Sequence, residues 1–126
     1  MNINILTIPH DQHRYPTCGD WWFDEAGSLQ IRVSDMGNPD YESLVALHEF
    51  VEVLLCKKKG ITTEQVDAFD KAFEAARVEG NDDEPGDDPK APYKKEHFFA
   101  TNIEALTSAE LGVDWQTYEA AINELP

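Results

Sequence analysis

The chain has 126 residues, 41% of them hydrophobic, and its 25 acidic and 10 basic side chains give a formal net charge of −15. This length suits a single domain over residues 1–126 with a buried core. The negative charge repels nucleic acid phosphate and anionic membrane surfaces, so we expect no direct partner of these kinds, whereas a cation, a basic peptide or a basic protein surface would be attracted.

The N-terminal residues MNINILTIPH contain no basic region and no small-residue cleavage site, which argues against a secretory signal. No apolar run reaches the ~18 to 20 residues that span a bilayer. We therefore expect a cytoplasmic protein. Cys18 and Cys56 belong to no C-x-x-C pair, and we expect both to be reduced thiols.

The first part of the chain, residues 2–34, predicts strands. Residues 2–8 (NINILTI) alternate polar and apolar side chains, a pattern typical of an edge or outer strand. Residues 21–23 and 29–33 flank the turn sequence DEAGS, which favours a hairpin. The apolar positions of its second strand are Leu29, Ile31 and Val33.

Helices are predicted in the rest of the chain, at about residues 41–59, 62–79, 93–106 and 115–124. Asp40 is the expected N-cap of the first helix, and Gly60 is its expected end. Two capping boxes are predicted, Thr62 with Gln65 and Thr107 with Glu110; the second opens a further short helix.

The segment 79–90 contains six acidic residues, two prolines and two glycines, so it predicts an acidic loop or a locally disordered segment. Strands that are followed by helices indicate an α+β fold. We therefore expect a small antiparallel N-terminal sheet followed by a helical layer.

The first predicted helix contains the most informative segment, LVALHEFVEVLLC at residues 44–56, in which ten of thirteen residues are apolar. The exceptions are His48, Glu49 and Glu52. Burying an unpaired ionisable group costs several kcal/mol, so such groups are normally paired, hydrogen-bonded or bound to a metal. Three of them inside one buried helix indicate a site.

His48 and Glu52 are four residues apart, so in a helix they point from the same face, one turn apart. In the H-E-x-x-H motif of zinc hydrolases, two ligands with this spacing hold zinc and the Glu between them is the general base. Here Glu52 replaces the second His. A carboxylate is a competent ligand for Zn²⁺, and it shifts the preference slightly toward harder ions such as Mn²⁺ or Fe²⁺.

A zinc site needs a third protein ligand, and His97, on the third predicted helix, is the best placed candidate. His48, Glu52 and His97 would then hold the metal, with Glu49 as general base. Two carboxylates on the same helix, Glu96 and Glu104, are candidates for an additional ligand or for the acceptor that orients an imidazole.

This pattern, over roughly residues 29–106, resembles the core of the zincin metallopeptidases, and most closely the small gluzincin-like domains of bacteria and phages. The resemblance implies a hydrolase of peptide or amide bonds, with Leu29, Ile31 and Val33 on the strand that binds the substrate. The segment GDWWFDEAGSLQIRVSDMG and the HE-x-x-E helix also resemble small proteins encoded by tailed phages and prophages. That likeness implies a location in the host cytoplasm.

Several alternatives stay open. The three polar groups can form an internal network with Arg32, Arg77 or a lysine, or the helix can be less buried than its composition indicates. The chain can also be an acidic, non-enzymatic interaction protein of phage type that binds a host protein, or a degenerate zincin scaffold. The distance between the ring nitrogens of His48 and His97 decides between these readings of the helix, because two ligands of one zinc must lie about 3 to 4 Å apart.

Overall fold

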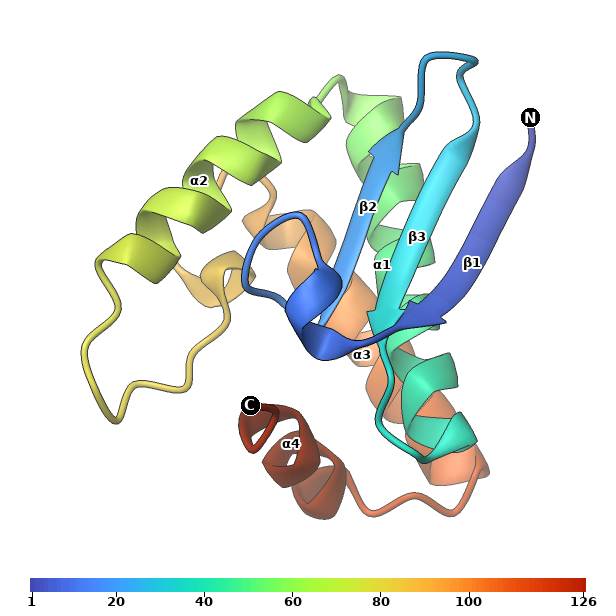
Figure 1. Cartoon of the computed structure of the whole chain (residues 1–126), viewed down its shortest axis with the longest axis vertical. Coiled ribbons are helices and arrows are strands. Elements are labelled where there is room, and N and C mark those ends of the chain that lie inside the picture. The colour runs from blue at the N-terminus through green and yellow to red at the C-terminus, as the bar shows by residue number, and fades with distance from the viewer.

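The computed structural model describes all residues, 1–126, as a three-stranded sheet followed by helices (Figure 1). The α+β prediction is therefore confirmed. The strands are β1 (Ile3–Ile8), β2 (Gly19–Phe23) and β3 (Leu29–Ser34); the helices are α1 (Pro39–Lys59), α2 (Thr63–Ala75), α3 (Lys94–Glu110) and α4 (Trp115–Asn123). Two short 3₁₀ helices, η1 (His10–Gln12) and η2 (Pro85–Asp87), interrupt the loops.

The strand order is β1-β3-β2. β2 and β3 form the predicted antiparallel hairpin, and β1 is the predicted edge strand. The prediction of an antiparallel sheet is wrong for β1, which pairs with β3 in parallel. The connection at residues 9–18 carries the chain past the position of β3, so that β3 enters between the two earlier strands. The alternation of polar and apolar residues predicts which residues form strands, but it does not predict the order of the strands in the sheet.

Helix α1 begins at Pro39, and its N-cap is Asn38, whose side chain accepts from the backbone N–H groups of Asp40 and Tyr41. The prediction of Asp40 as N-cap is wrong because Pro39 already suits the first helical position. Gly60 ends the helix in the left-handed conformation, with φ of 75°, as predicted. α1 lies between the sheet and α3, which explains why it is apolar on more than one side (Figure 1).

The other helix boundaries agree with the sequence in part. The capping box of Thr62 and Gln65 opens α2 as predicted, but the helix ends at Ala75 rather than at residue 79. The predicted break at Thr107 is wrong, because its hydroxyl donates to the carbonyl of Ile103 and α3 continues to Glu110. No helix has both the length and the apolar character needed to cross a bilayer.

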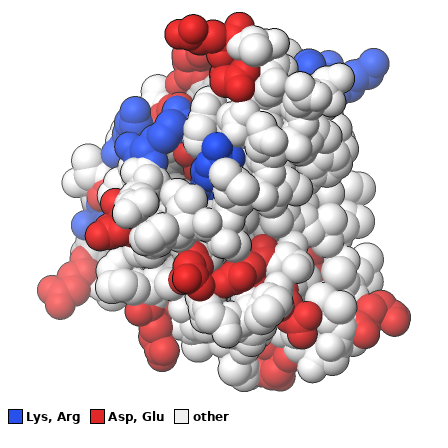
Figure 2. All heavy atoms as spheres, turned by 45° about the vertical axis from the view of Figure 1, so that its right-hand side comes forward, with Lys and Arg blue, Asp and Glu red and all other residues white.

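The acidic side chains are distributed widely over the surface. On the face in Figure 2 the Asp and Glu side chains extend from top to bottom, whereas the Lys and Arg side chains lie mostly in its upper half. The segment 79–90, after α2, contains six acidic residues and η2, whose Gly86 is buried. This loop is thus packed against the rest of the protein at its second half.

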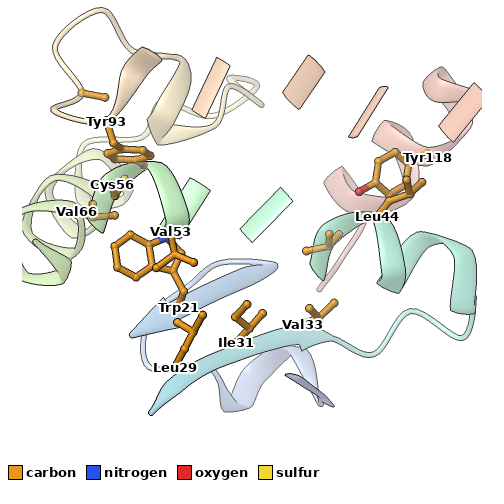
Figure 3. Packing of buried hydrophobic residues seen from close by; sticks show 12 residues of the cluster. Trp21, Leu29, Ile31, Val33, Leu44, Val53, Cys56, Val66, Tyr93 and Tyr118 are labelled. Atoms are coloured by element: carbon orange, nitrogen blue, oxygen red, sulfur yellow. The ribbon is translucent and has the colours of Figure 1, made fainter. Parts of the chain in front are cut away.

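The core lies between the sheet and α1 (Figure 3). Leu29, Ile31 and Val33 of β3 are at most 1% exposed and face Val53 and Leu44 of α1. This apolar layer fixes the position of α1 relative to the sheet. Because α3 packs on the far side of α1, His48 of α1 meets Glu104 and His97 of α3.

Candidate metal centre

His48 and Glu52 of α1 meet His97 of α3 in one cluster. Nε2 of His48, Oε2 of Glu52 and Nδ1 of His97 form a triangle whose three sides each measure 3.1 Å. The three residues are 6%, 4% and 5% exposed. Of the three ionisable groups of α1 that are expected to be buried, His48 and Glu52 are buried and Glu49 is partly buried. The ring nitrogens of His48 and His97 lie within the range expected for two ligands of one ion.

The triangle has the dimensions of one face of a small metal site. Zn–N and Zn–O bonds of about 2.0–2.1 Å place neighbouring ligand atoms of a tetrahedron roughly 3.3 Å apart. The measured sides of 3.1 Å differ from this value by a few tenths of an ångström. The three side chains also line a cavity of about 310 Å³, which leaves a route to the cluster from outside.

A carboxylate from α3 orients His48. Nδ1 of His48 lies 2.8 Å from Oε1 of Glu104, and Oε2 of Glu104 accepts from the hydroxyl of Tyr118 at 2.5 Å. A carboxylate acceptor places the proton of a neutral imidazole on Nδ1, so Nε2 presents its lone pair to the triangle. Glu104 thus occupies the place of the acceptor that orients an imidazole, one of the two roles considered for it.

Glu52 is held in a similar way by a residue that the motif does not indicate. The indole Nε1 of Trp21, on β2, donates to Oε1 of Glu52 at 3.1 Å. This hydrogen bond leaves the other carboxylate oxygen, Oε2, directed at the two imidazoles. Trp21 is 4% exposed, and its sequence context, a pair of tryptophans on a strand, predicts burial but not this partner.

The acidic segment holds His97. Its Nε2 lies 3.1 Å from Oε2 of Glu84 and 3.2 Å from Oδ1 of Asp87, although neither contact has good hydrogen-bond geometry. Gly86 lies against the imidazole, and a Cβ at this position would lie 2.3 Å from the ring Cγ. The sequence of this segment predicts only a loop, so these contacts depend on tertiary structure.

Glu49, the predicted general base, lines the same cavity. Burial and the neighbouring Glu52 raise the pKa of the Glu49 carboxyl well above its usual range. Its carboxylate lies against the backbone of β2, where a Cβ on Gly19 would lie 2.6 Å from Oε1 of Glu49. Gly19 is therefore needed for this approach, a role that the sequence does not reveal.

Two predictions about other residues are corrected. Glu96 is directed away from the cluster and pairs with Lys59, at 2.6 Å from its Nζ. Leu29, Ile31 and Val33 lie on β3, the central strand, which has a neighbour on both edges. Their backbone groups are used inside the sheet, so β3 cannot pair with an extended substrate.

The predicted alternative of a network with Arg32 or Arg77 is also wrong. Arg32 stacks on Trp22 with its guanidinium carbon 5.1 Å from the ring centroid, and Arg77 pairs with Glu74 at 2.8 Å. No lysine or arginine forms an ion pair with His48, Glu52 or His97. The carboxylates around the cluster are therefore balanced by no permanent cation of the protein.

The pKa values of the cluster reflect this excess of negative charge. Burial lowers the pKa of His48, but its contacts with Glu104 and Glu52 outweigh burial and raise it well above the usual range. The pKa of His97 is likewise raised, because its contacts with Asp87 and Glu52 outweigh burial. Burial opposes ionisation of Glu52, but the two imidazoles lower its pKa to about 2. The cluster thus strongly favours positive charge at its centre.

Comparisons of the chain with protein-family models, with curated proteins and with solved structures found no match.

Proposed function

We propose that the protein binds a divalent metal ion, with Zn²⁺ as the first candidate, through His48, Glu52 and His97. The observation that carries this proposal is the buried triangle of ligand atoms with three sides of 3.1 Å. Two imidazole nitrogens and one carboxylate oxygen form a common ligand set for zinc. Because one ligand is a carboxylate, Mn²⁺ and Fe²⁺ are the other candidates.

Hydrogen bonds alone explain the triangle less well than a bound cation does. With Glu52 ionised, its oxygen can only accept, and each ring nitrogen either accepts or donates one proton. Whichever protons are placed, at least one side of the triangle joins two acceptors or two donors at 3.1 Å. A cation at the centre removes this conflict, since all three atoms then direct lone pairs at it.

We further propose that the protein hydrolyses a peptide or amide bond. A metal held by these residues supplies a Lewis acid that polarises a carbonyl group and lowers the pKa of a water molecule. Glu49 follows His48 in the chain and lines the same cavity. Its carboxyl forms no hydrogen bond with the surrounding groups, and a cation held by the neighbouring ligands would favour the ionised form, which could take a proton from water as general base.

A strand edge beside the cavity supports a peptide as substrate. Cys18 accepts from the backbone of Ser34, and β2 continues from this point with β3 on one side only. Because alternate residues of an antiparallel strand face the neighbouring strand, the N–H and C=O groups of Trp21, which lines the cavity, point away from β3. An extended peptide can pair with this edge of β2. The substrate strand would thus be β2 instead of β3.

Metal analysis tests the first part of the proposal. We expect untagged protein to contain about one equivalent of metal by inductively coupled plasma mass spectrometry, and His48→Ala to contain none. His13→Ala removes a partly buried histidine outside the cluster and serves as the matched control, so it should keep the metal. A folded wild-type protein that takes up neither zinc, manganese nor iron after dialysis would refute metal binding.

A peptide hydrolysis assay tests the second part of the proposal. On a library of quenched fluorescent peptides, the metal-loaded protein should show turnover that Glu49→Gln reduces about 10²- to 10⁴-fold, the usual contribution of a general base. The variant should retain the metal, because Glu49 is not a ligand. Metal binding without any turnover would instead identify a zincin-like scaffold that has lost its activity.

The net charge of −15 favours one other function, an acidic interaction protein that binds a basic surface of a host protein. Such a complex should dissociate as salt screens the charges. Pull-down from a bacterial lysate at low and high salt tests this idea. A partner that remains bound at high salt contradicts an electrostatic decoy.

A further inference from the structure

Strand β1 forms an uncovered edge of the sheet. It pairs with β3 along one side, and no strand lies along its other side. Ile5 is registered with Ile31, a core residue, so Ile5 and Ile3 lie on the face of the sheet that α1 covers. α1 packs mainly on β2 and β3, however, and Ile3 and Ile5 remain 40% and 49% exposed. Large apolar side chains are thus in contact with solvent beside an open strand edge.

The free backbone groups at this edge belong to alternate residues of β1. The carbonyl of Ile8 accepts from the N–H of Asp35 at 2.7 Å, so the even-numbered residues of β1 direct their backbone groups at the β3 side. The N–H and C=O groups of Ile3, Ile5 and Thr7 therefore point away from β3. They have no hydrogen-bond partner within the protein. These three residues can pair with a further strand without any change in the sheet.

The edge lacks the features that usually protect a free strand. Residues 2–9 contain no Asp, Glu, Lys or Arg, although the chain as a whole has a net charge of −15. The pairing with β3 continues from Ile3 to Ile8 without a bulge. Figure 2 turns the β1 side of the molecule toward the viewer and shows a broad area without charged side chains to the right of its centre. Charges, bulges and covering segments are the ordinary protection against edge pairing, so β1 is open to it.

We propose that β1 is a dimerisation edge, along which two copies of this chain pair in antiparallel orientation about a twofold axis at Ile5. With Ile5 opposite Ile5 of the second copy, Ile3 lies opposite Thr7 on both sides of the axis. All outward backbone groups then fall in hydrogen-bonded pairs, whose two residues exchange both N–H and C=O contacts. The side chains of these residues also share one face of the joined sheet. The strand is therefore complementary to itself, as a twofold interface requires.

A second copy suits this edge better than a charged foreign segment does. A basic segment is attracted to the acidic surfaces of the protein instead of to a neutral strand, and an acidic segment is repelled by the net charge. Because β3 lies between β1 and β2, the joined sheet has a β2 strand at each outer edge. The cavity that β2 borders therefore lies away from the twofold axis. The inference does not depend on the proposed function.

The dimer should be weak, and salt should strengthen it. A strand of six residues is about 20 Å long, so its pairing buries less area than a standard protein interface. Two copies with a charge of −15 each repel one another at low ionic strength, and salt screens this repulsion. The sign of the salt effect is opposite to that expected for an electrostatic complex with a basic partner.

Sedimentation equilibrium of the full chain tests the proposal. Over about 10 to 500 µM protein, the mass should rise from 14.2 kDa toward twice that value, and it should do so at lower concentration in 500 mM than in 50 mM salt. A mass of 14.2 kDa at every concentration in 500 mM salt overturns the proposal. Masses that grow beyond the dimer overturn it as well, because a twofold contact is closed.

Charge-swapped variants place the axis at Ile5. In I5E and in I5K, two like charges would lie directly opposite each other, so either variant alone should dimerise at least about tenfold more weakly than the wild type. An equimolar mixture of the two should dimerise again, because the introduced carboxylate faces the introduced ammonium group. Ile5 is half exposed, so both variants should fold, and recovery in the mixture would itself show that they do. A mixture that stays monomeric under conditions in which the wild type dimerises overturns the proposal.

A control variant on the same strand separates this register from a general effect of charge. Leu6 lies on the opposite face of the sheet, and in the proposed dimer it is opposite Asn4 instead of its own copy. L6E should therefore weaken the dimer less than about threefold. Equal losses in I5E and L6E overturn the axis at Ile5.

Amide hydrogen exchange identifies the backbone groups that the dimer uses. In 500 mM salt and at high protein concentration, the amides of Ile3, Ile5 and Thr7 should become protected, and dilution should remove this protection. The amides of Asn4 and Leu6 already face β3 and should be protected in both states. Exchange at Ile5 that does not differ between the dimer and the monomer overturns the proposal, even if the protein associates.

Discussion

Gly86 lies on the face of the His97 imidazole, so closely that a Cβ at residue 86 would be 2.3 Å from Cγ of the ring. This contact joins the acidic segment to the candidate metal centre. Hydrogen on the glycine Cα is the only substituent that fits there. The orientation of one proposed ligand therefore depends on a residue with no polar side chain.

We expect Gly86→Ala to weaken metal binding about 10- to 100-fold, the usual cost of disturbing the residues that orient a ligand. The added methyl group has to displace either the His97 ring or η2. Competition with a chromogenic chelator measures the affinity. Pro85→Ala alters the same turn without adding an atom over the ring and should have a much smaller effect. Equal affinity of Gly86→Ala and wild type would show that the ring moves aside at no cost.

Trp21→Phe should lower metal affinity by roughly 1 kcal/mol, which is about fivefold, because it removes the indole N–H that holds Glu52. The aromatic ring and most of its packing are retained. The adjacent tryptophan provides the control, since Trp22 packs against Arg14 and Arg32 and makes no contact with the cluster. If Trp22→Phe weakens metal binding as much, the loss reflects the stability of the sheet.

Two glutamates on α3 allow a matched comparison. Glu104→Gln replaces the carboxylate that accepts from His48 and Tyr118, so metal affinity should fall about 10- to 100-fold. Glu96→Gln removes one charge from the same helix, but Glu96 pairs with Lys59 outside the cluster. Isothermal titration calorimetry with Zn²⁺ separates the two variants. Similar affinities would show that Glu104 does not orient His48 in the metal-bound protein.

The stability of the metal-free protein should depend on pH through Asp70. Burial raises the pKa of this carboxyl to about 7, although the hydroxyls of Tyr93 and Tyr15 favour its ionised form. The unfolded chain has the ordinary value of about 3.9, so between pH 4 and 7 the folded state holds more protons than the unfolded state. The contribution of Asp70 to the free energy of unfolding therefore decreases as the pH rises, by at most about 1.4 kcal/mol per pH unit.

Asp70→Asn removes this titration and resembles the protonated acid in shape. Urea unfolding in the presence of a chelator, at pH 4 to 7, should show that the variant gains stability relative to wild type as the pH rises. Other titrating groups affect both proteins and cancel in the difference. Parallel pH profiles of the two proteins would mean that the pKa of Asp70 is close to normal in the folded state.

The sequence predicts the part of the candidate site that depends on local spacing. His48 and Glu52 lie four residues apart in an apolar helix, so their common face and their burial follow from the pattern. His97 is predicted as a ligand from residue type alone, since the chain contains only four histidines. The position of α3 against α1 then brings it to the cluster, although no local signal specifies this packing.

The remaining contacts depend on chain topology. Trp21 reaches Glu52 because β2 lies at an edge of the sheet, and its alternation pattern predicts burial alone. Because β1 pairs with β3 in parallel, Leu29 and its neighbours lie on the central strand, so the proposed binding edge belongs to β2. Gly86 lies in a segment whose composition favours a loop, and composition cannot reveal that the loop closes over an imidazole.

The two helices that provide the proposed ligands are joined by α2 and the acidic segment, so a metal held by Glu52 and His97 would act as a cross-link across this excursion of the chain. Cross-links reduce the entropy of the unfolded chain, and their effect grows slowly with the length of the closed loop. Loss of the ion would free the two ends of the segment between Glu52 and His97, next to the acidic residues that pack on His97. Proteolytic nicking between α2 and η2 would then report whether the centre is filled, without any knowledge of a substrate.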